Sequence, residues 1–494
     1  MACKVLIKKR LLDLKPFKQY FFSKENRLRL IIFSALLAGL SSYSHYFSLL
    51  IWFSLSPLLI TIKDSNPKEN IFYSFIFAIV FFSTVLFWVG FVTIVGLFFL
   101  IFYLSFYIIT FSFLAKYYLN KSTAFFTIPA CWLILETLRE NIWCGFGWPN
   151  LGYTQYKNLY INQVADIFGV KFISFLIIMA NMFLYELLFN KKHIVKKFII
   201  LMCIFIFCFT YSLYRLNTIK EKNFLEISLV QPNHSETLKQ ISAKAVIGGL
   251  KNLIEKTPPN SLVILPEASW PVLIDEFRWY QLTKIIKQLK RNIILGALIK
   301  ENENFYNAAL YFSSNGNLVD IYRKIKLVPF GEYVPLRKYL GFIRPINDIA
   351  DMERGTIRTV FDYKGKKFSV LICFEDIFPL FVSSISKNID FLINITNDEW
   401  FFGNPQARQH LSIMCFRAIE TRRPIIRAAN TGISGWVAAT GRIKKIVKEN
   451  KEVFFKGVFF EKLPLAKASS IYVKIGEVFP LFCGIILIIC IFKK

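Results

Sequence analysis

The chain has 494 residues, a formal charge of +28, a hydrophobic fraction of 54% and a mean hydropathy of +0.44. Disordered chains are excluded, because they are poor in the aromatic and branched apolar residues that are abundant here. The length and the nine scattered cysteines exclude a small disulfide scaffold. The charge fits either a nucleic-acid-binding protein or a membrane protein with basic cytoplasmic loops, and its distribution decides between them.

Eight apolar stretches predict membrane spans, because about 18 or more apolar residues form a helix that crosses the hydrocarbon core. The stretches lie near 28–44, 46–62, 71–90, 92–115, 122–138, 165–188, 198–214 and 478–492. A long basic lead precedes the first stretch and no clear small-residue cleavage site follows it, which favours an uncleaved anchor over a signal peptide. We therefore expect seven spans in a membrane domain over 1–215 and a C-terminal span in 471–494.

The short loops predict the orientation of these spans. With the N-terminus inside, the inside segments carry Lys63, Lys68, Lys116, Lys121, Lys191, Lys192, Lys196, Lys197, Lys493 and Lys494. The only Lys or Arg residues of the outside loops are Arg139 and Lys157. Since basic loops stay in the cytoplasm, both termini are expected there and residues 216–477 on the opposite side. Glu136, Arg139 and Glu140 share a helical face, which indicates either an interfacial ion pair or a polar lining toward an outer site.

From residue 216 the pattern changes to short apolar, β-branched runs that alternate with helical patterns. The expected strands lie at 224–231, 261–267, 292–299, 368–375, 389–398 and 424–430, with a hairpin around 314–317 and helices at 278–290 and 406–422. This alternation predicts an α/β domain over 216–470. The domain carries 37 Lys and Arg against 24 Asp and Glu, but no basic cluster interleaved with aromatics, so no nucleic-acid partner is expected.

Two of the nine cysteines, Cys373 and Cys415, lie in this domain. No CxxC or Cys/His spacing indicates a metal site, and we expect neither a metal nor another cofactor. A disulfide between the two cysteines is one hypothesis for an oxidising compartment. The helical pattern around Cys415 favours a buried thiol instead. Cys373, Glu267 and Lys324 each end an apolar strand, and although each alone is more often structural, strand ends are where α/β folds place functional side chains.

Four segments resemble the nitrilase superfamily, whose catalytic set is Glu–Lys–Cys. They are LPEAS (265–269), YRKIKLVPFGEYVP (322–335), LICFED (371–376) and NDEWFFGNPQARQH (397–410). With its membrane half and closing span, the chain resembles the bacterial apolipoprotein N-acyltransferases over essentially its whole length. The resemblance implies a four-layer αββα sandwich beside a multi-pass helical domain of about eight spans.

The resemblance also implies an activity and a location. The reaction would transfer an acyl chain from a phospholipid to the N-terminal amine of a diacylglyceryl-cysteine apolipoprotein, through a thioester. The protein would contact membrane lipids in the bacterial inner membrane, with the catalytic domain on the periplasmic side and without a cofactor.

The matching motif positions imply a role for each site residue. Glu267 corresponds to the general base, Lys324 to the cation that stabilises the oxyanion, and Cys373 to the nucleophile. Glu332 and Glu375 correspond to supporting acids, and the candidate substrate contacts are Phe374, Trp400 and Tyr333. The chain departs from residues common in the family at Leu265, Phe374, Gln240, Phe402 and Lys474. These departures affect expected substrate contacts more than the reaction.

Two other functions fit parts of the pattern. A membrane-tethered nitrilase-type amidase would hydrolyse a C–N bond at the same three residues, but a soluble substrate does not need a lipid-facing half. A transporter or interaction protein would concentrate functional polar residues in the spans, whereas the candidates here cluster in the α/β domain.

Overall fold

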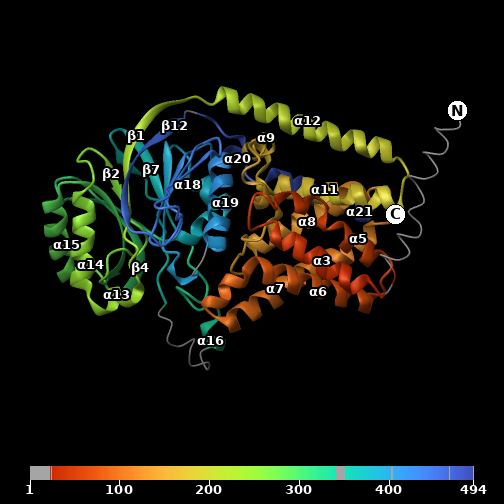
Figure 1. The fold of residues 1–494 in the computed structure, drawn as a ribbon, viewed down its shortest axis with the longest axis horizontal. Coiled ribbons are helices and arrows are strands. Elements are labelled where there is room, and N and C mark those ends of the chain that lie inside the picture. The colour runs from red at the N-terminus through yellow and green to blue at the C-terminus, as the bar shows by residue number, and fades with distance from the viewer. Residues whose placement is uncertain (1–22, 24, 341–350, 402–403, 467, 493–494) are drawn as a thin grey trace. The chain divides into compact units, whose positions relative to one another are not determined.

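The computed structural model describes residue 23 and residues 25–340, 351–401, 404–466 and 468–492. It divides into two compact units, which are described separately. The first contains Met1–Thr137, Ile173–Ile204 and Pro480–Lys494, and the second contains Leu138–Phe172 and Phe205–Phe479 (Figure 1).

Apolar helices dominate the first unit and the segments that join it to the second. They are α3 (Arg27–Leu40), α4 (Ile51–Ser54), α5 (Ser56–Lys63), α6 (Pro67–Leu86), α7 (Ile94–Tyr118), α8 (Ala124–Asn141), α11 (Val170–Phe189), α12 (Ile194–Thr218) and α21 (Val478–Phe492). Among the described residues, four segments are long and apolar enough to cross a membrane: Pro67–Phe91, Ile94–Tyr118, Val170–Phe189 and Ile194–Thr218. These four helices fit a membrane protein.

The other four expected spans lie on helices that are shorter or more polar. Helix α3 has 14 residues, and Ser48–Lys63 and Val478–Ile491 are also short apolar segments. Helix α8 has 18 residues but carries Glu136, Arg139 and Glu140 near its C-terminal end. The helix lengths and compositions therefore support four of the eight expected spans.

A buried amide explains why the stretch near 46–62 is not one continuous helix. The chain breaks between α4 and α5, and the Asn181 side chain of α11 accepts hydrogen bonds from the backbone N–H groups of Leu55 at 2.8 Å and Ser56 at 3.0 Å. Its Nδ2 donates to the carbonyl of Ile51 at 2.9 Å. Backbone groups in an apolar environment need such partners, so Asn181 stabilises the break.

The second unit contains two six-stranded sheets. The first has the order β12-β1-β2-β3-β4-β5 and the second β11-β10-β9-β8-β7-β6. The strands of the first sheet are β1 (Glu221–Gln231), β2 (Leu262–Ile264), β3 (Asn292–Glu301), β4 (Asn304–Phe312), β5 (Leu318–Arg323) and β12 (Gly457–Ala466). Those of the second are β6 (Phe361–Tyr363), β7 (Lys366–Ile372), β8 (Phe391–Thr396), β9 (Ile425–Ala429), β10 (Gly435–Val437) and β11 (Ile443–Lys445).

Both sheets have a parallel centre and antiparallel edges. Strands β1, β2 and β3 are parallel neighbours, as are β7, β8 and β9. Strands β4 and β5 form the expected hairpin around 314–317, with Ala309 opposite Tyr322. The six strands predicted from apolar runs are all present, which confirms the predicted α/β architecture.

Helices cover the outer face of each sheet, giving four layers (Figure 1). They are α13 (Glu236–Ile241), α14 (Ala243–Glu255) and α15 (Glu276–Leu289) on one side, and α18 (Pro379–Ile385) and α19 (Asn404–Thr421) on the other. Leu250 of α14 and Ile286 of α15 belong to one buried cluster with Leu295 of β3. Between the sheets, the Tyr311 ring lies 5.9 Å from the ring of Phe368. Apolar side chains thus fill both the helix–sheet and the sheet–sheet interfaces.

Short helices complete the second unit. They are α9 (Leu159–Asn162), α10 (Ala165–Phe168), α16 (Arg337–Leu340) and α20 (Ile471–Ile475).

Candidate active site

Strand ends bring the candidate side chains to one place. Cys373 directly follows β7, and Asn397 directly follows β8, its parallel neighbour. Glu267 comes three residues after β2, and Lys324 directly follows β5. The carboxyl ends of parallel strands are where α/β folds collect functional groups. Cys373 has a backbone φ of 51°, a left-handed conformation that is costly for a side-chain-bearing residue and is concentrated at functional sites.

Two carboxylates hold the Lys324 ammonium. Lys324 Nζ donates to Glu332 Oε1 at 2.9 Å and to Glu267 Oε1 at 3.2 Å. Asn307 Nδ2 donates to the same two oxygens, at 2.8 Å each. The backbone N–H of Asn397 donates to Glu267 Oε2 at 3.0 Å. Each carboxylate therefore has a fixed orientation before any substrate is present.

The buried Lys324 remains a cation. Burial alone lowers the pKa of an ammonium, but the carboxylates of Glu267 and Glu332 outweigh that effect and raise the Lys324 pKa above its ordinary value. The side chain is 1% exposed, so its charge acts in a site from which most water is excluded. A fixed positive charge in such a site can stabilise negative charge that develops on a substrate.

The Cys373 thiol is free, and burial raises its pKa well above the ordinary value. The negative charge of Glu267 raises that pKa further, whereas the Lys324 cation and a hydrogen bond from Thr396 lower it. The resting side chain is therefore a neutral thiol with an acceptor and a cation in electrostatic range. A base must remove its proton before or during attack on a carbonyl carbon.

Glu375 ties the cysteine turn to the lysine segment. Its Oε2 accepts from the backbone N–H of Ile372 at 2.8 Å, and its Oε1 accepts from the N–H groups of Ile325 at 2.8 Å and Lys326 at 3.0 Å. The Tyr322 hydroxyl also donates to this carboxylate, at 2.8 Å. Burial raises the pKa of Glu375 to about 7 despite these donors. The carboxylate thus cross-links the residues flanking two candidate catalytic groups.

A glycine allows the segment carrying Glu267 to approach the sheet. A Cβ on Gly296 of β3 would lie 2.2 Å from the Pro266 carbonyl oxygen and 2.7 Å from Glu267 Cα. These distances are shorter than real side chains show, so no other residue fits without moving the backbone. Ala268, the next residue, has a φ of 47°.

Two family models match the chain. Residues 34–183 match the apolipoprotein N-acyltransferase N-terminal domain, and residues 226–459 match the carbon-nitrogen hydrolase model. An apolipoprotein N-acyltransferase from Geobacter metallireducens is 30% identical over 483 residues, covering 92% of this chain and 92% of that protein. The chain belongs to the apolipoprotein N-acyltransferase family.

A second apolipoprotein N-acyltransferase, from Haemophilus ducreyi, is 31% identical and covers 69% of this chain and 70% of that protein. Among solved structures, a nitrilase-superfamily member from Saccharomyces cerevisiae covers 50% of this chain and 92% of its own at 18% identity, with a TM-score of 0.38. The carbon-nitrogen hydrolase match and the two sheets therefore identify the nitrilase-like fold of this acyltransferase.

Other sequence predictions have different outcomes in this acyltransferase. Cys373 and Cys415 are both free, so the disulfide hypothesis is wrong, and Cys415 is buried as expected. Phe374 is 9% exposed and its ring lies 5.3 Å from that of Phe378. Trp400 is 53% exposed on a single helical turn, and Tyr333 lines a cleft described below.

The departures from the family fall in varied surroundings. Leu265 is fully buried in the α14–α15 cluster, whereas Gln240 and Lys474 are exposed. Phe402 lies outside the described residues. Of the described residues, no group of three or more His, Cys, Asp or Glu is arranged to hold a metal ion.

The charged side chains of α8 have hydrogen-bond and ion-pair partners. Glu136 accepts a hydrogen bond from Trp132 Nε1 at 2.9 Å, and Arg139 donates to Asn150 Oδ1 at 2.5 Å. Glu140 pairs with Lys171.

Sequence patterns missed Asn307, Thr396 and Asp398. Asn307 interrupts an otherwise apolar run in β4. This interruption could have predicted a functional or structural role, because a buried amide needs hydrogen-bond partners. Thr396 and Asp398 flank Asn397 at the end of β8, and the Thr396 hydroxyl lies 3.2 Å from Asp398 Oδ1. Burial alone would raise the pKa of Asp398, but the Arg427 guanidinium, 2.8 Å away, helps to hold it well below its usual range, so this carboxylate is ionised.

Proposed function

We propose that this enzyme transfers an acyl chain from a phospholipid to the N-terminal amine of a diacylglyceryl-cysteine apolipoprotein, through a thioester at Cys373. The observation that carries the proposal is the hydrogen-bonded set of Glu267, Lys324 and Glu332, because Glu267 and Lys324 also lie in electrostatic range of the Cys373 thiol. Family membership supports the substrate class, since the relatives are named apolipoprotein N-acyltransferases.

In the first half-reaction, Glu267 removes the Cys373 proton as the sulfur attacks the donor's ester carbon. A general base is required because the thiol is neutral at rest. The negative charge that develops on the carbonyl oxygen is stabilised by the Lys324 ammonium. Collapse of the intermediate breaks the ester C–O bond, and the departing lysophospholipid takes the proton from Glu267.

In the second half-reaction, the apolipoprotein amine attacks the thioester carbon. Glu267 removes a proton from the nitrogen, the C–S bond breaks, and the proton returns to the Cys373 sulfur. The products are an N-acylated lipoprotein and the starting enzyme, so the kinetics are ping-pong. Glu332 and Glu375 act as supporting acids, the first by fixing Lys324 and the second by fixing the turn after β7.

The organisation that this function needs is also a proposal. Residues 1–215 and 471–494 form a multi-pass membrane domain of about eight spans in the inner membrane, and residues 216–470 form the periplasmic catalytic domain. The lysines of the short loops support this orientation, with both termini in the cytoplasm. Four helices of spanning length and composition support the multi-pass character.

Labelled phospholipid tests the reaction. The wild-type enzyme is expected to acquire a hydroxylamine-sensitive acyl label that Cys373→Ala lacks. Cys415→Ala is the matched control, because it removes the other thiol of the domain from a buried site away from the reactive turn. Label that remains on Cys373→Ala contradicts the assignment of the nucleophile. Label released only as free fatty acid, even with an amine acceptor present, would indicate the amidase-type hydrolase instead.

Engineered cysteines test the orientation. Lys387 and Lys192 are both exposed, the first in the α/β domain and the second in an expected cytoplasmic loop. In intact spheroplasts, a membrane-impermeant maleimide should label Lys387→Cys above the background of the unsubstituted protein and should label Lys192→Cys only after permeabilisation. The reverse pattern contradicts the orientation.

A further inference from the structure

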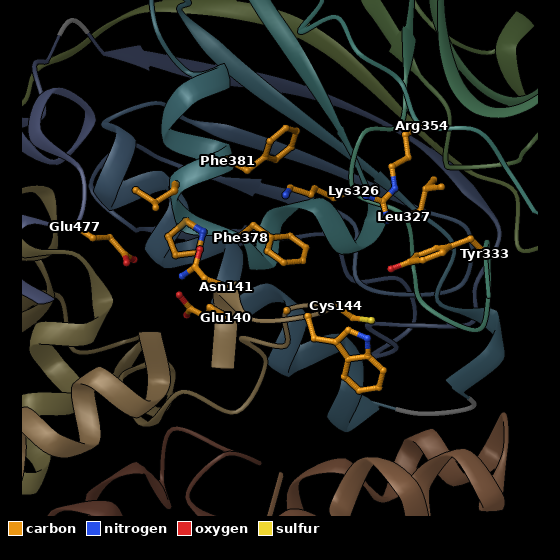
Figure 2. Close-up of a pocket in the computed structure, with 14 residues that line it drawn as sticks. Glu140, Asn141, Cys144, Lys326, Leu327, Tyr333, Arg354, Phe378, Phe381 and Glu477 are labelled. Atoms are coloured by element: carbon orange, nitrogen blue, oxygen red, sulfur yellow. The ribbon is translucent and has the colours of Figure 1, made fainter. Parts of the chain in front are cut away.

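A small cleft in the second unit lies next to the candidate catalytic residues. Its volume is about 160 Å³, and its lining includes Lys326, Tyr333, Arg354 and Phe378 (Figure 2). Pockets that enclose a whole drug-sized ligand are larger, at about 300–1,000 Å³. The cleft therefore suits a compact polar group, with acyl chains outside it.

Backbone hydrogen bonds connect the walls of the cleft to the reactive groups. The N–H of Lys326 donates to Glu375 Oε1 at 3.0 Å, and the N–H of Gly355 donates to the carbonyl of Lys324 at 2.8 Å. Tyr333 directly follows Glu332 in the chain. A group held in this cleft would consequently lie close to the site of acyl transfer.

Two cations in the cleft are available to a ligand. Lys326 and Arg354 are exposed, and no ion pair joins either of them to a carboxylate among the described residues. Lys326 Nζ lies 5.3 Å from the centroid of the Phe378 ring, and the Arg354 guanidinium lies 4.8 Å from the centroid of the Tyr333 ring. Aromatic faces position a cation while leaving N–H groups free to donate.

The acidic groups of the cleft do not cancel this charge. Glu140 and Glu477 both pair with Lys171, so their negative charge is already partly neutralised. In Figure 2, Glu477 lies on the opposite side of the cleft from Arg354 and Tyr333. Burial raises the pKa of the Cys144 thiol and raises that of Tyr333 to about 12, so both are neutral at pH 7. The side of the cleft formed by Lys326 and Arg354 is therefore positive.

We propose that Lys326 and Arg354 bind the phosphate of the donor phospholipid's headgroup in this cleft. The inference rests on the proposed function, because it assigns the position of the acyl donor. Guanidinium and ammonium groups form short, charge-assisted hydrogen bonds to phosphate oxygens. Holding the phosphate there would limit the positions that the donor's ester carbon can take beside Cys373.

Two acyl donors, one with a phosphate group and one without, separate headgroup binding from acyl transfer. The full-length enzyme in mixed micelles is supplied either with phospholipid or with a p-nitrophenyl ester of the same fatty acid, which lacks phosphate. Lys326→Gln and Arg354→Gln are each expected to raise the KM for phospholipid about tenfold with little change in kcat. Both should leave the p-nitrophenyl ester reaction unchanged. Lys387→Gln, which removes an exposed lysine elsewhere in the domain, is the matched control.

The results that would overturn the proposal are distinct. An unchanged KM for phospholipid in the Lys326→Gln/Arg354→Gln double variant would show that the two cations do not bind the phosphate. An equal loss of activity with phospholipid and with the p-nitrophenyl ester would show the same. Inhibition of the wild type by inorganic phosphate as strong as that by glycerophosphoethanolamine would assign the cleft to free phosphate instead. Failure of the wild type to form an acyl adduct with either donor would contradict the proposed function itself.

Discussion

The substitution Gly296→Ala tests whether the position of Glu267 limits the reaction. The new methyl group would lie 2.2 Å from the Pro266 carbonyl oxygen, whereas ordinary contacts begin at 3.4 Å. The loop must therefore move by about 1 Å, and a displacement of this size at a catalytic group costs about 100-fold in rate. The expected loss of folding stability is smaller, about 1–3 kcal/mol for an overpacked site.

The assay is the rate of acyl-adduct formation on the full-length enzyme, with thermal unfolding measured on the same preparation. Gly248→Ala is the control, since a Cβ at this position in α14 meets no atom within 4 Å. Alanine within a helix is favoured over glycine by about 0.5–1 kcal/mol, so the control should be at least as stable as the wild type and fully active. A folded Gly296→Ala enzyme that forms the adduct at the wild-type rate would refute the reasoning.

Three further substitutions test the surroundings of the site. Because burial raises the pKa of Glu375 to about 7 from an ordinary value of 4.5, its stabilising contribution is complete below pH 4.5 and is lost as the pH rises through 7. Between pH 4.5 and 8 the wild type should lose up to about 3 kcal/mol more unfolding free energy than Glu375→Gln, and equal losses would be the contrary result. Thr396→Val removes a hydrogen bond that lowers the Cys373 pKa, so alkylation of Cys373 by iodoacetamide should shift to higher pH. Thr283→Val on α15 is the control and should leave the pH profile unchanged. Identical profiles for Thr396→Val and the wild type would exclude the Thr396 hydroxyl as a donor to Cys373. Asn307→Ala should lower the unfolding free energy by about 1–3 kcal/mol, because two buried carboxylates lose a donor, and unaltered thermal unfolding would argue against that network.

The sequence predicted the catalytic candidates because each of them ends a strand. Glu267, Lys324 and Cys373 follow apolar runs whose ends are visible in the chain, and the structure gives Glu267 and Lys324 a direct contact at 3.2 Å. Asn307 could not be assigned in the same way. It lies in the middle of β4, and its two carboxylate partners are distant in sequence and meet it only after the strands pair.

The apolar stretches were less informative about helix continuity. Hydropathy alone does not reveal that Asn181, 126 residues away from Leu55, accepts the hydrogen bonds that let the helix break at that point. Likewise, the charged residues near the end of α8 lower its apolar character. The long uniform stretch predicted at 92–115 corresponds to one continuous helix, Ile94–Tyr118, which is long and apolar enough to cross a membrane.

The most direct test of acyl transfer through Cys373 follows the fate of an isolated acyl-enzyme. The enzyme is labelled with radioactive phospholipid, freed of unreacted donor, and mixed with a synthetic diacylglyceryl-cysteine peptide in a single turnover. We expect the label to leave Cys373 and to appear on the peptide amine in a hydroxylamine-resistant bond, with little free fatty acid. Label that stays on the enzyme, or that is released to water at the same rate with and without the peptide, would contradict the account.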